Sequence, residues 1–131
     1  MSKYAFGKSV TVGFDQAVQR VTEELGKVGF GVLSDIDVQG TMKKKIGLDM
    51  PPYRILGACN PQLALRALQA EPDIGLLLPC NVIVRAEPSD RVVVGFVNPQ
   101  SLVGLSSAPD VSAVADEAEQ RLRRACARLK V

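Results

Sequence analysis

The sequence predicts an α+β fold: a two-layer sandwich in which helices back one face of a largely antiparallel sheet, in the order β-α-β-β-α-β-β-α. Three observations lead to this prediction. Strand-like apolar patterns occur in five segments, apolar residues recur every three or four positions in three others, and turn-forming residues separate the segments. The chain has 131 residues, the length of one domain, so we take 1–131 as a single domain.

The first half of the chain alternates between the two patterns. Residues 4–12 form the first predicted strand, and the apolar stripe that starts at Phe14 predicts a helix that ends near Gly29. Residues 30–38 alternate again, which predicts a strand with one mostly solvated face. Four residues are expected on one side of this strand: Val32, Ser34, Ile36 and Val38.

A long connection and a well-marked helix start follow. Residues 39–52 contain two glycines and two prolines, and we expect no more than one helical turn there, at 41–46. Residues 53–59 form the third predicted strand. Asn60 followed by Pro61 is a strong helix start, because asparagine caps helices and proline suits the first helical position.

The second half contains the most apolar stretch. Residues 74–87 predict a long central strand covered on both faces, with a bulge or an exposed register at Pro79. Residues 91–97 pair back as a hairpin, and 98–109 form a loop. From Asp110 the apolar stripe of a long amphipathic helix runs to the end of the chain.

Composition excludes several functional classes. The net charge of +2 gives no reason to expect a nucleic-acid partner. The chain has no histidine, which rules out a His-assisted nucleophile, the usual catalytic zinc sets and a His haem ligand. We therefore predict no metal site and no cofactor. Three cysteines, no signal peptide and no apolar stretch of ~20 residues predict a cytoplasmic protein without a membrane partner.

Two Cys-Asn dipeptides, Cys59-Asn60 and Cys80-Asn81, are the candidate site. Cys59 precedes a helix, where unpaired N–H groups stabilise a thiolate, but buried cysteine and capping asparagine are equally ordinary structural elements. Asn81 lies in an apolar strand and needs hydrogen-bond partners there, either in a loop or in a site. Cysteines on neighbouring strands would be ~5 Å apart, and on strands separated by a third ~10 Å, and the sequence leaves the strand order open.

A basic run, Lys43-Lys44-Lys45, lies in the long connection. It could attract an anionic ligand or cover the cysteines as a lid, or it is simply solvated surface. Asp35 and Asp37 share one strand face, and nothing around them suggests acid–base chemistry. Cys126 lies on the apolar stripe of the last helix and is expected in the core.

Four segments together resemble the bacterial domain-of-unknown-function family numbered 302: residues 30–38, 41–47, 53–61 and 75–82. The resemblance covers nearly the whole chain and includes both Cys-Asn dipeptides with their prolines, Pro61 and Pro79. It implies a fold similar to that of the TATA-box-binding protein, with a strongly curved antiparallel sheet, and a homodimer. It implies no catalytic residue, and the likeness to a DNA-binding fold does not imply DNA binding.

These observations lead to one preferred hypothesis and two alternatives. The first is a small homodimeric binding module, in which Cys59, Asn60, Cys80 and Asn81 bind a small anionic or thiophilic ligand beneath Lys43–Lys45. The second is a thiol-based redox or sulfur-carrier protein that uses Cys59 with Cys80. The third is a structural or partner-binding dimer with both dipeptides in the core. Whether the protein is an enzyme is left open.

Overall fold

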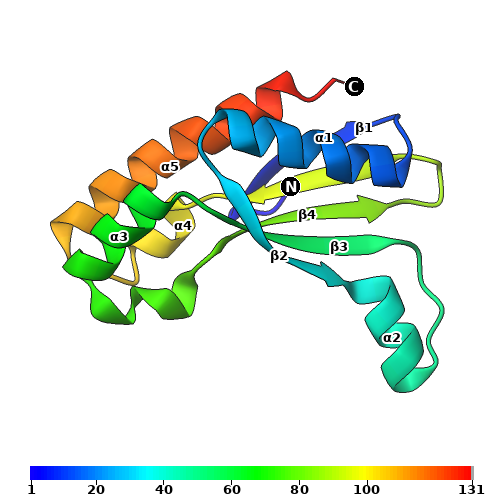
Figure 1. Cartoon of the computed structure of the whole chain (residues 1–131), viewed down its shortest axis with the longest axis horizontal. Helices are drawn as coiled ribbons and strands as arrows, with labels where there is room; N and C mark the ends of the chain where they lie inside the picture. The colour runs from blue at the N-terminus through cyan, green and yellow to red at the C-terminus, as the bar shows by residue number, and fades with distance from the viewer. Residues whose placement is uncertain (131) are drawn as a thin grey trace.

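In a computed structural model, which describes residues 1–130, the chain forms one five-stranded antiparallel sheet with the strand order β1-β5-β4-β3-β2 (Figure 1). The α+β sandwich predicted from the sequence is confirmed. β1 and β2 are the two edges, and β4 is the central strand. The strands are β1 (Ala5–Val10), β2 (Gly31–Asp37), β3 (Tyr53–Cys59), β4 (Cys80–Ala86) and β5 (Val92–Val97).

Helices α1 and α5 lie together on one side of the sheet (Figure 1). At one end of the sheet are α3, the 3₁₀ helix η1 and α4, and at the opposite end α2 extends away from α1 and α5. The helices are α1 (Phe14–Lys27), α2 (Val38–Ile46), α3 (Pro61–Ala70), η1 (Pro72–Leu77), α4 (Gln100–Val103) and α5 (Pro109–Arg128).

The core lies between the sheet and the α1–α5 layer. It is built mainly from valine, leucine and alanine, as a chain with few aromatic residues requires. The side chains that face the helices from the central strands, such as Val82, Val84 and Val94, are fully buried. Cys126 on α5 is also buried, as its place on the apolar stripe predicts.

The prediction of one long strand over 74–87 is wrong in its first half. Residues 72–77 form η1, and β4 begins only at Cys80, directly after Pro79. Proline cannot donate to a strand ladder, so pairing starts after it. The apolar run before it is not a covered strand: Ile74 is buried, whereas Leu76 is 88% exposed.

The connection at 39–52 contains more helix than expected. α2 has nine residues because both of its ends are capped: the Asp37 side chain accepts a hydrogen bond from Gly40 N (2.9 Å), and Gly47 ends the helix with a φ of 66°. The loop predicted at 98–109 likewise contains the short helix α4.

The predicted alternation along β2 is interrupted. A bulge between Val32 and Ser34 leaves Leu33 without a partner and changes the side on which the following residues lie. Val32 therefore pairs with Ala58, which faces the helices, whereas Ser34 pairs with Gly57, which does not. Val38 is already the first residue of α2.

Candidate functional site

An apolar cleft lies where β2, β3 and β4 meet α3, and we call it the thiol cleft. Its volume is ≈ 430 Å³. Its walls come from the three strands, from one side of α3, from η1 and the connection after it, and from two residues of α5. The lining contains no charged residue: Phe30, Leu33, Ser34, Ala58, Cys59, Asn60, Leu63, Ala64, Ala67, Leu68, Gly75, Leu78, Pro79, Cys80, Val114 and Ala118.

Cys59 and Asn60 connect β3 to α3 at the edge of this cleft. The predicted cap is confirmed, because Asn60 Oδ1 accepts a hydrogen bond from Leu63 N at 3.0 Å and Pro61 is the first residue of the helix. Asn60 is buried and Cys59 is partly buried. One amide oxygen of the candidate site therefore has a structural role, and the Cys59 thiol remains available to the cleft.

Cys80 enters the same cleft from the first position of β4. The strand order left open by the sequence is now determined: β3 and β4 are antiparallel neighbours, and Cys80 pairs with Ala58, the residue before Cys59. Burial, and to a smaller extent the nearby Cys59, raise the pKa of the Cys80 thiol from 9.0 to about 11. Cys80 is therefore a neutral thiol near pH 7. None of the three cysteines forms a disulfide.

A close backbone approach shapes one wall of the cleft at Gly57. A Cβ at this position would lie 2.8 Å from Pro79 Cγ and closer still to Ser34 Oγ. Only glycine therefore lets β2 and the segment before β4 pack against β3 here. This contact positions Pro79, the last residue of the connection after η1.

Asn81 does not join the other three residues of the two dipeptides. It pairs with Gly57, and its side chain is exposed on the sheet face away from α1 and α5. It therefore lies by solvent and not in a buried strand, which removes the need for a protein partner. The structure brings together Cys59, Asn60 and Cys80 and places Asn81 on the other side of the sheet.

The three lysines are also far from the cleft. Lys43, Lys44 and Lys45 lie on α2, at the end of the sheet opposite α3 (Figure 1), and none of them lines the cleft. Lys43 pairs with Asp49 at 2.9 Å. The structure thus gives no support to a lysine lid over the cysteines.

The two β2 carboxylates have structural partners. Asp35 accepts a bidentate hydrogen bond from Arg54 on β3, and this bond lowers the pKa of Asp35. Asp37 caps α2, as described above. The interpretation of this pair as a structural, solvated feature agrees with these contacts.

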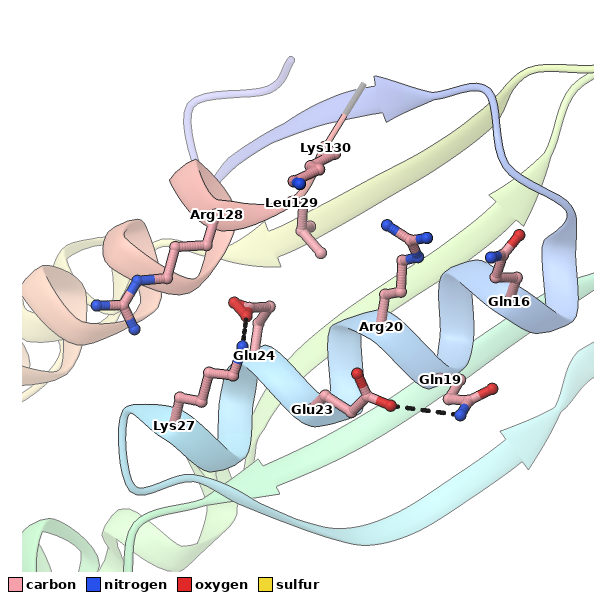
Figure 2. A pocket seen from close by; sticks show the side chains of 9 residues that line it. All are labelled: Gln16, Gln19, Arg20, Glu23, Glu24, Lys27, Arg128, Leu129 and Lys130. Atoms are coloured by element: carbon pink, nitrogen blue, oxygen red, sulfur yellow. Dashed lines mark hydrogen bonds and ion pairs between the residues drawn. The ribbon is translucent and has the colours of Figure 1, made fainter.

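A second hollow of ≈ 370 Å³ lies between α1 and the end of α5 (Figure 2), and we call it the α1–α5 groove. Glu24 is its one deeply buried charge, with 9% of its surface exposed. Its Oε1 accepts a hydrogen bond from Lys27 Nζ at 2.6 Å, and its Oε2 is buried without a partner among residues 1–130. Most of the other residues around the groove are charged or polar: Gln16, Gln19, Arg20, Glu23, Arg128, Leu129 and Lys130.

Sequence reasoning missed most of the residues that line the thiol cleft. The start of α3 was predicted, but not that one side of this helix borders a hollow. One signal was present: Ala64 and Ala67 of α3 and Ala118 of α5 have short side chains where two helices meet a sheet end. Small residues on facing elements leave unfilled volume.

Residues 1–130 contain neither a metal-binding cluster nor a membrane-spanning helix. No set of three or more Cys, Asp or Glu side chains lies close enough together to hold a metal ion. No helix in the same part of the chain has both the length and the apolar character needed to cross a bilayer.

Comparison with known proteins identifies the family. No curated protein matches the chain. Among solved structures, the chain is similar to an uncharacterized conserved DUF302 protein from Bacillus stearothermophilus, with 32% identity and a TM-score of 0.89 over 98% of this chain and 100% of the other. Residues 6–129 match the family described as domain of unknown function DUF302. The chain therefore belongs to the DUF302 family.

Proposed function

We propose that this protein is a small binding protein whose thiol cleft holds an apolar or thiophilic molecule. The observation that carries the proposal is the cleft itself: a hollow of ≈ 430 Å³, lined by aliphatic side chains and by a few polar or sulfur groups. Clefts of this size, largely apolar with a small number of converging polar groups, are typical small-molecule sites.

The lining favours an uncharged ligand. No charged side chain borders the cleft, and moving an ion there would remove its hydration without providing a counter-ion. Burial of ~200 Å² of apolar ligand surface contributes about 5 kcal/mol before the entropic cost of association. The Ser34 hydroxyl and the two thiols add weak polar and soft contacts that would orient the ligand.

The proposal includes a homodimer and a cytoplasmic location. Three cysteines outside any disulfide fit a reducing compartment. The dimer follows from the family resemblance.

Binding of N-phenyl-1-naphthylamine, an uncharged fluorescent probe, tests the proposal. Ala64 lines the cleft and is only half-buried, so Ala64→Phe would occupy the hollow with little risk to folding. We expect probe affinity to fall at least tenfold in this variant. The matched control, Gln16→Phe, fills the α1–α5 groove instead and should leave affinity unchanged. Equal affinity in both variants, or no binding by the native protein, would contradict the proposal.

Thiol redox or sulfur-carrier chemistry is the second candidate, favoured by one observation: Cys59 and Cys80 border the same cleft from neighbouring strands. The raised pKa of Cys80 weakens it, because thiolates and not thiols attack sulfur. Alkylation with iodoacetamide from pH 5 to 9, followed by mass spectrometry, separates the candidates. Rapid modification of Cys59 well below pH 8 would favour redox chemistry, and inertness of both thiols would exclude it.

A purely structural role for the two dipeptides is the remaining alternative. Under this alternative, the Cys59→Ala and Cys80→Ala variants would lose stability and would retain probe binding unchanged. The binding proposal expects each variant to alter probe affinity, because both thiols border the cleft.

A further inference from the structure

A second hollow adjoins the thiol cleft, and we call it the η1 hollow. It has a volume of ≈ 60 Å³ and is bordered by η1, α4 and the first half of α5, at the end of the sheet where α3 lies (Figure 1). Five residues border both the cleft and this hollow: Ala67, Leu78, Cys80, Val114 and Ala118. The two hollows are therefore neighbours, and Cys80 lies between them.

The surroundings change from exposed and partly polar to buried and apolar along this pair of hollows. On the β2 side of the cleft, Ser34 is exposed and Leu33 is 72% exposed, so the cleft opens to solvent there. On the side that adjoins the η1 hollow, Ala67, Val114 and Ala118 are buried. The η1 hollow itself is lined only by apolar side chains and the Cys80 thiol. A molecule that spans both hollows therefore finds polar surroundings at one end only.

The small volume of the η1 hollow restricts the shape of what enters it. One water molecule needs ~10–15 Å³ of such space, so ≈ 60 Å³ admits a few atoms in a row but no ring system of the size of naphthalene. Two residues that border both hollows, Ala67 on α3 and Ala118 on α5, have short side chains. A single carbon chain therefore crosses between the hollows with less displacement of the wall than a ring would need.

We infer that the ligand of the thiol cleft is a molecule with one unbranched hydrocarbon chain and one uncharged polar end, such as a long-chain alcohol or an acyl ester. The inference rests on the proposed function and names the class of its ligand. The polar end lies on the β2 side beside Ser34, and the chain passes Cys80 and ends in the η1 hollow. Among residues 1–130, no charged side chain borders either hollow, so a charged end would lose hydration without gaining a counter-ion.

Competition between straight-chain 1-alkanols and bound N-phenyl-1-naphthylamine tests the inference. In the native protein, affinity should rise about fourfold for each carbon from 1-hexanol to 1-decanol, as expected for a methylene group that leaves water. Ala115 borders the η1 hollow and not the cleft, so Ala115→Val narrows that hollow alone. We expect this variant to bind 1-decanol at least tenfold more weakly and to bind 1-hexanol and the probe as the native protein does. The matched control, Ala113→Val, changes an exposed position of α5 that borders neither hollow and should leave all three affinities unchanged.

A second variant provides a check at a position that is less buried than Ala115. Leu77 on η1 is half-buried and borders the η1 hollow alone. Leu77→Phe should therefore also lower the affinity for 1-decanol and not that for 1-hexanol. Its control is Leu76→Phe, at the neighbouring position that is 88% exposed.

The outcomes separate the two proposals. No binding of N-phenyl-1-naphthylamine by the native protein would overturn the proposed function and the inference with it. If the probe binds, equal affinity for 1-hexanol and 1-decanol would overturn only the inference, as would folded Ala115→Val and Leu77→Phe variants that bind 1-decanol as tightly as their controls. If neither variant folds, NMR of the native protein decides: the amide signals of Ile74 and Ala115 should shift with 1-decanol and not with 1-hexanol, and equal shifts with both alcohols would overturn the inference.

Discussion

The thiol cleft and the α1–α5 groove have similar volumes, ≈ 430 and ≈ 370 Å³, but opposite linings. The cleft is bordered by aliphatic side chains and thiols. The groove is bordered by arginine, lysine, glutamate and glutamine (Figure 2). Transfer of an apolar ligand from water into the cleft is favourable, whereas a ligand in the groove must displace water from charged groups, most of which are solvent-exposed. The residues that line each hollow, and not its volume, therefore distinguish the candidate site from the groove.

The largest expected difference between the thiol cleft and the α1–α5 groove is the pH dependence of the free energy of unfolding. In the folded protein Cys80 has a pKa of about 11, against 9.0 ordinarily, so between these values the unfolded chain releases this proton and the folded chain keeps it. The contribution of Cys80 to stability is therefore full below pH 9 and is lost as pH rises through 11. It amounts to about 2–3 kcal/mol. Urea denaturation at pH 8 to 11 measures it, with Cys80→Ala as the variant in which this component disappears.

A change of pH acts on the rest of the chain as well. Only the difference between the native protein and Cys80→Ala is therefore informative. A difference that stays constant from pH 8 to 11 would contradict the burial of the thiol in the cleft.

A second contrast uses two glycines. Gly57→Ala places a Cβ against Pro79 and Ser34 at the wall of the cleft, and we expect a loss of about 1–3 kcal/mol in the free energy of unfolding. Gly26→Ala on α1, where a Cβ meets nothing within 4 Å, should instead stabilise the protein by about 0.5–1 kcal/mol. Chemical denaturation of both variants measures the two changes in the free energy of unfolding, which should have opposite signs. A neutral Gly57→Ala would mean that the wall is not closely packed.

The smallest effect is expected in the groove. Glu24→Met removes a buried carboxylate that has only one hydrogen-bonded oxygen, so the free energy of unfolding should change by less than about 1 kcal/mol. Lys27→Met is the control, because it leaves the carboxylate buried without its partner and should be the more destabilising of the two. The reverse order, measured by thermal denaturation, would show that Glu24 has a role that its contacts do not reveal.

The sequence predicted the fold where local chemistry decides it. The apolar stripe of α1, the Asn60-Pro61 start of α3 and the long last helix all follow from periodicity and capping. The prediction was wrong where the apolar pattern and the turn-forming residues indicated different structures. The apolar run at 74–78 fits a buried strand, but Pro72, Gly75 and Pro79 turn it into a 3₁₀ helix followed by a late strand start.

The site was predicted only in part, for a geometric reason. The side on which a strand residue lies depends on register, and register depends on pairing that the sequence does not contain. Cys80 and Asn81 are adjacent in the chain but pair with Ala58 and Gly57, so they point to opposite sides of the sheet. Cys59 and Cys80, 21 residues apart, meet at the cleft because β3 and β4 are antiparallel neighbours.

The most direct test of the binding proposal is a titration of ¹⁵N-labelled protein with N-phenyl-1-naphthylamine, followed by NMR. The amide signals of Ser34, Cys59, Asn60 and Cys80 should shift, and those of Gln16, Arg20 and Arg128 should not. Shifts confined to the α1–α5 groove, or no shifts at saturating probe, would contradict the assignment of the thiol cleft as the functional site.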